Sequence, residues 1–206
     1  MIDGNRIAKF CKTMPITALD QKTALVVIDI QKGIVAFPTV HPARAVVANV
    51  VQLADAFRER KLPVVLVHVG WAADLADAVK TRAEAKPLSP PLGSDFFEYV
   101  DELKANPQSD ILIQKRQWGA FYGTDLDLQL RRRAVTNIVL CGISTSIGVE
   151  STARDAWERA YNLAFAIDAM TDMNADAHDR ALKIIFPRIG ELGTTDEILG
   201  MLGSGH

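Results

Sequence analysis

The feature that most constrains this chain is the alternation of short apolar runs with segments of helical periodicity. The run ALVVIDI at 24–30 is almost continuously apolar, which is typical of a strand covered on both faces. Four further runs of strand length follow at 63–69, 110–115, 137–142 and 162–168. The alternation predicts an α/β fold: one three-layer α/β/α domain with a mostly parallel, six-stranded, Rossmann-like sheet, of which these runs locate five strands.

Helices are expected between the runs. Across 43–61 apolar residues recur at helical spacing and basic residues close the last turn. Thr124 is expected to cap a helix at 125–133, with Asp127 standing where a capping-box acid would stand. Similar patterns predict helices at 148–160, 176–186 and 194–202.

Composition narrows the class of protein. The 206 residues carry a formal net charge of −2, which makes no electrostatic case for binding nucleic acid or a membrane surface. No apolar run approaches the length of a membrane span, and residues 1–22 lack the apolar core of a signal peptide. We therefore expect a cytoplasmic protein with an N-terminal extension at 1–22 and one domain at 23–206. The irregular stretch at 70–107 is long enough to be a functional loop or lid.

Two charged residues end predicted strands. Asp29 follows a run of apolar residues, where it either pairs with a partner in the site or simply caps the following turn. Lys115 ends another strand, and taken alone it reads as a surface lysine whose stem packs on apolar neighbours. In parallel sheets ligands bind at the carboxyl ends of strands, so together the two form a candidate proton-transfer pair. We expect their strand ends to be neighbours and the charged groups to lie within roughly 4 Å.

A third strand end carries the stretch LCGISTSIGVESTARDA at 140–156. It reads as a tight turn entering a helix N-terminus, where the unpaired N–H groups of Ser144 and Gly148 can cradle an oxyanion. The small residues can equally serve only close packing of strand and helix. Candidate walls of a substrate pocket are the aromatic and basic residues at nearby strand ends: Trp71, Arg116, Trp118, Phe121 and Tyr122. His68 reads as a satisfied core residue, and His178 has no partner at metal-ligand spacing.

These blocks together resemble the isochorismatase-like hydrolase superfamily, and they are similar to a bacterial subgroup of uncharacterised members. ALVVIDIQKGI resembles the motif of the catalytic aspartate, here Asp29, and KRQWGAFYGTDL resembles the lysine motif, here Lys115. VLCGISTSIGVESTARDA resembles the nucleophile motif, but Gly148 stands where amidase members carry cysteine. The resemblance also implies a cis peptide bond between Ile143 and Ser144.

The departure at Gly148 limits the chemistry. Without a thiol there is no thioester route, and Cys141 sits seven residues earlier within the strand. The segment after the second strand lacks the histidines of the metal-binding members, so we expect no metal and no cofactor. Isochorismatases also lack the cysteine, and they hydrolyse a vinyl ether. The residues that bind the substrate carboxylate in isochorismatases do not stand out in this sequence. Arg82 and Arg116 are only candidates for that role.

Two functions of different class follow from the sequence. The first is a hydrolase of a small polar or anionic molecule that uses Asp29 and Lys115 without a cysteine nucleophile. The second is a small-molecule-binding or scaffold protein that kept the fold after losing the nucleophile. In either case the resemblance implies a homodimer or homotetramer, which exposed aromatics around Trp157 and Tyr161 would permit.

Overall fold

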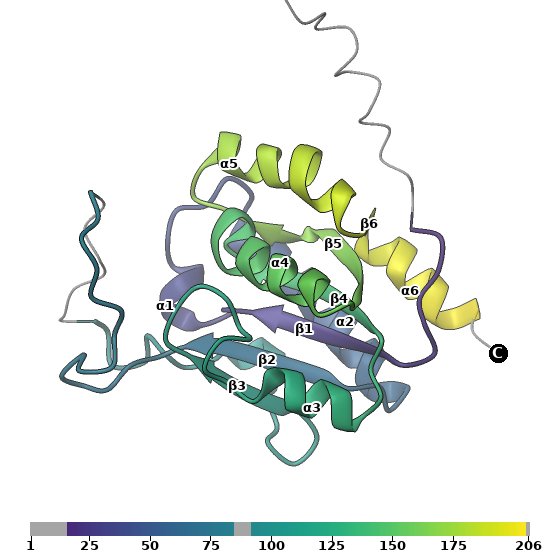
Figure 1. Ribbon diagram of the computed structural model, residues 1–206, viewed down its shortest axis with the longest axis horizontal. Coiled ribbons are helices and arrows are strands. Elements are labelled where there is room, and N and C mark those ends of the chain that lie inside the picture. The colour runs from purple at the N-terminus through teal and green to yellow at the C-terminus, as the bar shows by residue number, and fades with distance from the viewer. Residues whose placement is uncertain (1–15, 85–91, 205–206) are drawn as a thin grey trace, which may run out of the picture.

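A computed structural model describes residues 16–84 and 92–204 of the chain (Figure 1). Strands and helices alternate along these residues, as the apolar runs predict. The elements in chain order are β1 (Thr23–Ile28), α1 (Lys32–Val35), α2 (Ala43–Glu59), β2 (Val64–Val69), η2 (Asp101–Leu103), β3 (Ile111–Lys115), α3 (Leu126–Arg132), β4 (Asn137–Ile143), η3 (Thr145–Val149), α4 (Glu150–Glu158), β5 (Asn162–Thr171), α5 (Ala175–Arg180), η4 (Ala181–Ile185), η5 (Phe186–Arg188), β6 (Glu191–Gly193) and α6 (Thr195–Ser204).

All six strands are parallel and lie in the order β3-β2-β1-β4-β5-β6. The chain therefore winds outward from β1 in one direction and then from β4 in the other. This order places the topological switch point between β1 and β4, where α/β sheets of this type bind ligands. The sixth strand, which the sequence pattern did not locate, is a three-residue edge strand. It is too short to stand out as an apolar run.

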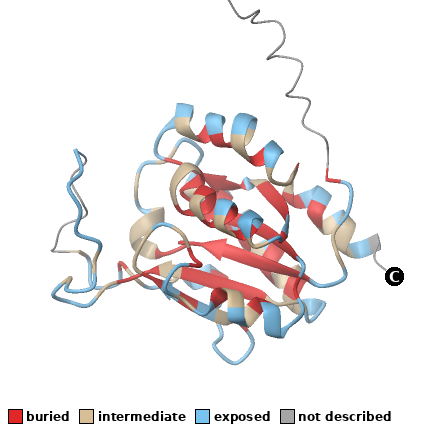
Figure 2. Ribbon diagram, viewed as in Figure 1, coloured by how far each residue is buried: buried red, intermediate tan, exposed pale blue. Residues whose placement is uncertain are grey.

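Helices cover both faces of the sheet, so the predicted three layers are confirmed (Figure 1). Residues of α3, α4 and η4 pack with one face of β1 and β4, and residues of α2 and α6 pack with the other. Figure 2 shows the central strands buried along their length, whereas the helices alternate buried and exposed faces. Burial on two faces explains why the sequence around β1, residues 24–30, is an almost continuous apolar run.

Several helix ends differ from the sequence-based expectation. The predicted helix at 148–160 is preceded by the π-helical turn η3, and the one at 176–186 ends as π-helical η4 and 3-10 helical η5. The helix expected at 125–133 spans Leu126–Arg132, and its N-cap residue is Asp125 rather than Thr124. Thr124 Oγ1 nevertheless accepts a hydrogen bond from Leu126 N–H at 3.2 Å. Asp127 forms no capping box: the N–H of Thr124 donates to Phe121 O at 3.3 Å, and the carboxylate of Asp127 accepts a hydrogen bond from the hydroxyl of Tyr161. Tyr161 is buried, so only Trp157 of the two expected surface aromatics is exposed.

The segments outside the central sheet are tied to it at defined points. Ile16, in the predicted N-terminal extension, is buried and belongs to the core on the α2 side of the sheet. The stretch after β2 extends away from the carboxyl edge of the sheet (left in Figure 1) and returns through η2 to β3. Tyr99 in this stretch pairs with Gln31 through an isolated bridge and donates its hydroxyl to Leu66 O at 2.8 Å.

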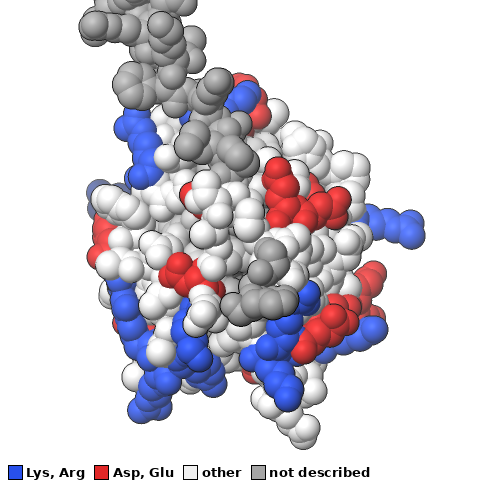
Figure 3. Space-filling view, turned by 90° about the vertical axis from the view of Figure 1, so that its right-hand side faces the viewer, with Lys and Arg blue, Asp and Glu red and all other residues white. Residues whose placement is uncertain are grey.

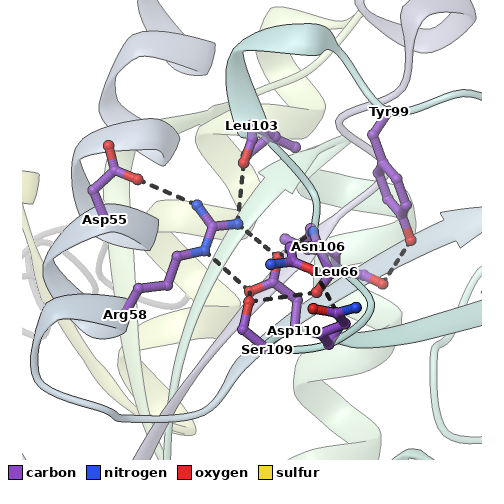
Figure 4. Close-up of polar contacts among 9 residues, drawn as sticks. Asp55, Arg58, Leu66, Tyr99, Leu103, Asn106, Ser109 and Asp110 are labelled. Carbon is purple, nitrogen blue, oxygen red and sulfur yellow. Dashed lines mark hydrogen bonds and ion pairs between the residues drawn. The ribbon is translucent and has the colours of Figure 1, made fainter.

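An arginine on α2 holds the return of this stretch to the sheet (Figure 4). Arg58 donates two hydrogen bonds to the carboxylate of Asp110, at 2.8 and 3.0 Å, and one to Leu103 O. Asp110 is buried and directly precedes β3, so this pairing fixes where the strand begins. The position of Lys115, the last residue of β3, therefore depends on where this strand begins.

Two further observations concern the distribution of charge on the surface and the hydrophobicity of the helices. The face in Figure 3 shows acidic and basic side chains interspersed. No helix among the described residues is long and apolar enough to cross a membrane.

Candidate active site

The site is built at the carboxyl edge of the sheet, at the switch point between β1 and β4. Asp29 follows β1 directly and adopts a left-handed backbone conformation with φ of 52°. Its N–H donates to Val67 O of β2 at 3.0 Å, which holds the turn against the neighbouring strand. A non-glycine residue in this conformation costs about 1–3 kcal/mol, and such residues cluster at functional sites.

Asp29 and Lys115 form a buried ion pair, and the predicted contact is present. Lys115 Nζ donates to Asp29 Oδ2 at 2.7 Å, with side-chain exposures of 2% and 9%. A second hydrogen bond runs from Nζ to Trp118 O at 2.8 Å. Asp29 Oδ1 is buried and has no hydrogen-bond partner among the described residues. Burial raises the pKa of Asp29, and the ammonium of Lys115 opposes part of that rise.

The expectation that the two strand ends are neighbours was wrong. Lys115 ends β3 and Asp29 follows β1, and β2 lies between these strands in the sheet. The contact forms nevertheless because Asp29 lies beyond the end of its strand and the long lysine side chain spans β2. The pair therefore depends on the length of Lys115 rather than on adjacency of strands.

Gly148 faces this pair, and its surroundings leave little space for a side chain. A Cβ atom placed on Gly148 would lie 3.2 Å from Asp29 Oδ2 and 3.4 Å from Lys115 Nζ. The same atom would lie 2.9 Å from Ile28 Cγ2, so even a methyl group would press on the core. The backbone of Gly148 thus closes directly over the charged groups.

The turn that carries Gly148 leaves the end of β4. The Ile143–Ser144 peptide bond is cis, as predicted. Gly142 in β4 has φ of 121°, and a Cβ there would lie 2.1 Å from Ile28 O, so only glycine allows β4 to approach β1 this closely. Three N–H groups of the turn, those of Ser146, Ile147 and Val149, are already hydrogen bonded. The predicted oxyanion donors, Ser144 and Gly148, are not among these three.

The remaining predicted site residues lie in different environments. Trp118 and Tyr122 are exposed by 66% and 76%, on the loop whose carbonyl binds Lys115. Trp71 is half-buried and donates its indole N–H to Arg116 O at 2.9 Å. The guanidinium of Arg116 pairs with Asp77 at 2.8 Å.

Two further candidates, Phe121 and Arg82, differ in their exposure to solvent. Phe121 is buried in the core against the ring of Tyr161 and beneath the guanidinium of Arg159, so we no longer count it as a substrate-binding candidate. Arg82 is exposed. The aromatic residues of the 116–122 loop look alike in the sequence, so the sequence did not tell which of their rings are buried in the core and which are exposed.

Sequence reasoning missed three buried polar residues at the same edge. Gln31 is fully buried, and its side-chain amide pairs with both backbone groups of Val69, at 2.8 and 3.0 Å. Asp172 and His178 contact the turn at 144–148 and are also buried. Asp172 directly follows an apolar strand, as Asp29 does, and that signal could have identified it.

The structure also bears on possible metal ligands and on the thiol of Cys141. Among the described residues, no three His, Cys, Asp or Glu side chains gather closely enough to hold a metal ion. Cys141 is fully buried within β4, and burial raises its thiol pKa well above the ordinary range. His68 is half-buried and its Nδ1 lies 2.8 Å from Tyr99 Oη, which agrees with its reading as a satisfied residue.

Comparisons with known proteins agree with this architecture. The isochorismatase domain model matches residues 23–197. The uncharacterized isochorismatase family protein YecD of Escherichia coli O157:H7 is 50% identical over 181 residues, covering 87% of this chain and 96% of YecD. An isochorismatase family protein from Burkholderia thailandensis superimposes with a TM-score of 0.88 at 45% identity, over 92% of this chain and all of that one. N-carbamoylsarcosine amidase from Thermoplasma acidophilum gives 0.69 at 27% identity, over 85% and 98% of the two chains.

Proposed function

This chain belongs to the isochorismatase family, and from that premise we propose that it is a hydrolase working without a cysteine nucleophile. Its substrate is a small polar or anionic molecule. Asp29 transfers the proton, and Lys115 orients the carboxyl group and balances its charge. Assembly into a homodimer or homotetramer in the cytoplasm is part of the same proposal.

The observation that carries this proposal is the state of Asp29. The residue holds a strained backbone conformation, a buried charge partner and a buried oxygen without a partner, all at one point. Each of these features costs free energy that a residue with only a structural role does not require. The unpartnered Oδ1 is suited to exchange a hydrogen bond or a proton with a bound molecule.

The chemistry that fits this site best is hydrolysis of a vinyl ether. Asp29 in its neutral form gives its proton to the terminal carbon of the enol ether, and an oxocarbenium ion forms at the carbon that bears the ether oxygen. Water adds to that carbon, and its released proton returns to Asp29. The resulting hemiketal then breaks into a carbonyl compound and an alcohol. No bond to the protein forms, so the lack of a side chain at Gly148 is no obstacle.

The pKa direction supports the acid role. Because burial raises the pKa of Asp29, a larger fraction of the carboxyl group is protonated near neutral pH than in water. The rate should be highest in acid and fall as the pH rises through the Asp29 pKa. A positioned general acid typically contributes about 10²–10⁴-fold to the rate.

A metabolite screen tests the proposal. Native protein is incubated with pools of small cyclic and anionic metabolites, enol ethers and ureido compounds included, and turnover is followed by mass spectrometry. Asp29→Asn should lower kcat by at least about 100-fold. Asp196→Asn, a change to an exposed aspartate of α6, is the matched control and should leave the rate unchanged. Circular dichroism confirms that both variants are folded.

The alternative function gives a different result in the same screen. The missing side chain at Gly148 is the observation that favours a binding or scaffold protein. Ligands that raise the melting temperature of native protein without being converted would support that alternative. Turnover that persists in folded Asp29→Asn would refute the role given to Asp29. Light scattering coupled to gel filtration reports the assembly state.

A further inference from the structure

We propose that Asp172 and His178 are positioning residues that hold the 144–148 turn over the Asp29–Lys115 pair. Both lie outside the catalytic pair, on β5's exit and on α5, and both are buried. The inference rests on the proposed function of the site for its effect on catalysis, whereas the geometry of the turn can be measured without a substrate.

Asp172 anchors the middle of the turn. Its Oδ2 accepts hydrogen bonds from Ser146 N at 2.7 Å and from Ser146 Oγ at 2.8 Å. Its Oδ1 accepts from Asn174 N at 3.1 Å, so both carboxylate oxygens are used. A buried carboxylate that receives two bonds from one residue fixes both the backbone and the side chain of that residue. Asp172 is held in turn by β5, whose last residues pair with Gly142 and Ile143 of β4.

His178 anchors the start of the turn through Thr145. Thr145 Oγ1 donates to Thr171 O at 3.0 Å and lies 2.8 Å from His178 Nδ1. A threonine hydroxyl has one hydrogen, and here it is committed to the carbonyl of Thr171. Thr145 Oγ1 must therefore accept from His178, which requires the proton on Nδ1. Burial lowers the pKa of His178, so the neutral ring is the form present near pH 7.

The same geometry excludes a nucleophilic role for the threonine. A hydroxyl, an imidazole and a nearby carboxylate resemble the parts of a catalytic triad. Thr145 is fully buried, however, and its hydrogen points to a backbone carbonyl rather than to the imidazole. The cluster is therefore a clamp, and its effect reaches the site through Gly148, three residues further along the turn.

A thiol placed at the turn reports its position without a substrate. Gly148→Cys in a Cys11→Ser background puts sulfur beside Lys115, and the pH dependence of iodoacetamide alkylation yields the thiol pKa. A Cβ at this position lies 3.4 Å from Lys115 Nζ and 3.2 Å from Asp29 Oδ2. The ammonium lowers the thiol pKa and the carboxylate raises it, so the pKa measured in the Gly148→Cys protein is the reference for the other variants. Adding Thr145→Val, His178→Leu or Asp172→Ala should raise the thiol pKa by about one unit. At a pH below the pKa, this lowers the fraction of thiolate about tenfold. Thr145→Ser and His178→Asn keep the donor and acceptor and should restore the original pKa.

A control variant separates positioning from stability. Tyr161→Phe removes one side-chain hydrogen bond, to Asp127 on α3, and should lower the melting temperature without moving the thiol pKa. If the three clamp variants only lower the melting temperature and leave the thiol pKa in place, the proposal is overturned. If the clamp variants raise the thiol pKa but the metabolite screen shows no turnover, the clamp is supported and the proposed hydrolase is rejected.

A second measurement needs no change at Gly148. The ring nitrogens of ¹⁵N-labelled native protein are assigned by comparison with His178→Asn. The expected result is a neutral His178 ring with its hydrogen on Nδ1. A ring with hydrogen only on Nε2 would overturn the clamp as assigned, because Thr145 would then donate to Nδ1 and could no longer donate to Thr171 O.

Discussion

Replacing Lys115 by methionine probes the electrostatics of the site without any substrate. Methionine keeps much of the apolar stem but removes the ammonium that lies 2.7 Å from Asp29 Oδ2. The other carboxylate oxygen has no partner among the described residues. The Lys115→Met variant therefore leaves a buried carboxylate with no opposite charge to balance it.

The expected loss is large. Removing one partner of a buried ion pair costs about 3–5 kcal/mol while the remaining group stays charged. That is a substantial part of the roughly 5–15 kcal/mol that stabilises a typical domain. For a domain of this size, about 2–4 °C of melting temperature is lost per kcal/mol, so the midpoint should fall by about 10 °C near neutral pH.

The loss should depend on pH with a definite sign. Burial raises the pKa of Asp29 and Lys115 opposes that rise, so removing Lys115 raises the pKa further. A folded-state pKa above the unfolded value favours the folded state in acid, where Asp29 is protonated in both states. The destabilisation of the variant should therefore be smallest below the unfolded pKa and grow as the pH rises through the folded pKa.

Urea unfolding of four proteins over a pH series measures this coupling. The set contains native protein, Lys115→Met, Asp29→Asn and the double variant, and Lys22→Met serves as a control on an exposed lysine. The double variant should recover most of the stability lost in Lys115→Met, because a neutral amide replaces the unpaired charge. The buried-pair reasoning would be refuted if Lys115→Met were as stable as native protein at every pH. It would also be refuted if the stability loss of the double variant equalled the sum of the losses of the two single variants.

Four further predictions follow from the same geometry. Gly142→Ala should prevent recovery of folded protein, since its Cβ would lie 2.1 Å from Ile28 O; expression and circular dichroism check this. Gly148→Ala should cost about 1–3 kcal/mol in urea unfolding by pressing on Ile28, and any substrate turnover should fall. Cys141 should resist a thiol reagent in native protein and react only as the chain unfolds, because burial raises its pKa and shields it. Any hydrolysis found should survive EDTA, and a loss that added zinc or iron restores would contradict the expectation that the site works without a metal.

The pattern of residue types in the sequence is enough to predict the fold class, and it singles out Asp29, Lys115 and the turn at Gly148 as a candidate site. Continuous apolar strands alternating with amphipathic helices are compatible with little except a parallel sheet covered on both faces. Asp29 stood out because a carboxylate after a buried strand requires a partner. The glycine-rich turn stood out because small residues between a strand and a helix allow close backbone approach. These signals are local, so a pattern of residue types suffices to detect them.

Which of these elements contact one another becomes visible only in the folded chain. Apolar periodicity tells which side chains are buried, but it does not tell what they are buried against. For that reason Phe121 and Tyr161 could not be placed in the core in advance, and His178 could not be paired with Thr145, 33 positions away. The reach of Lys115 across β2 likewise depends on strand order, which is set by the packing of segments far apart in the chain.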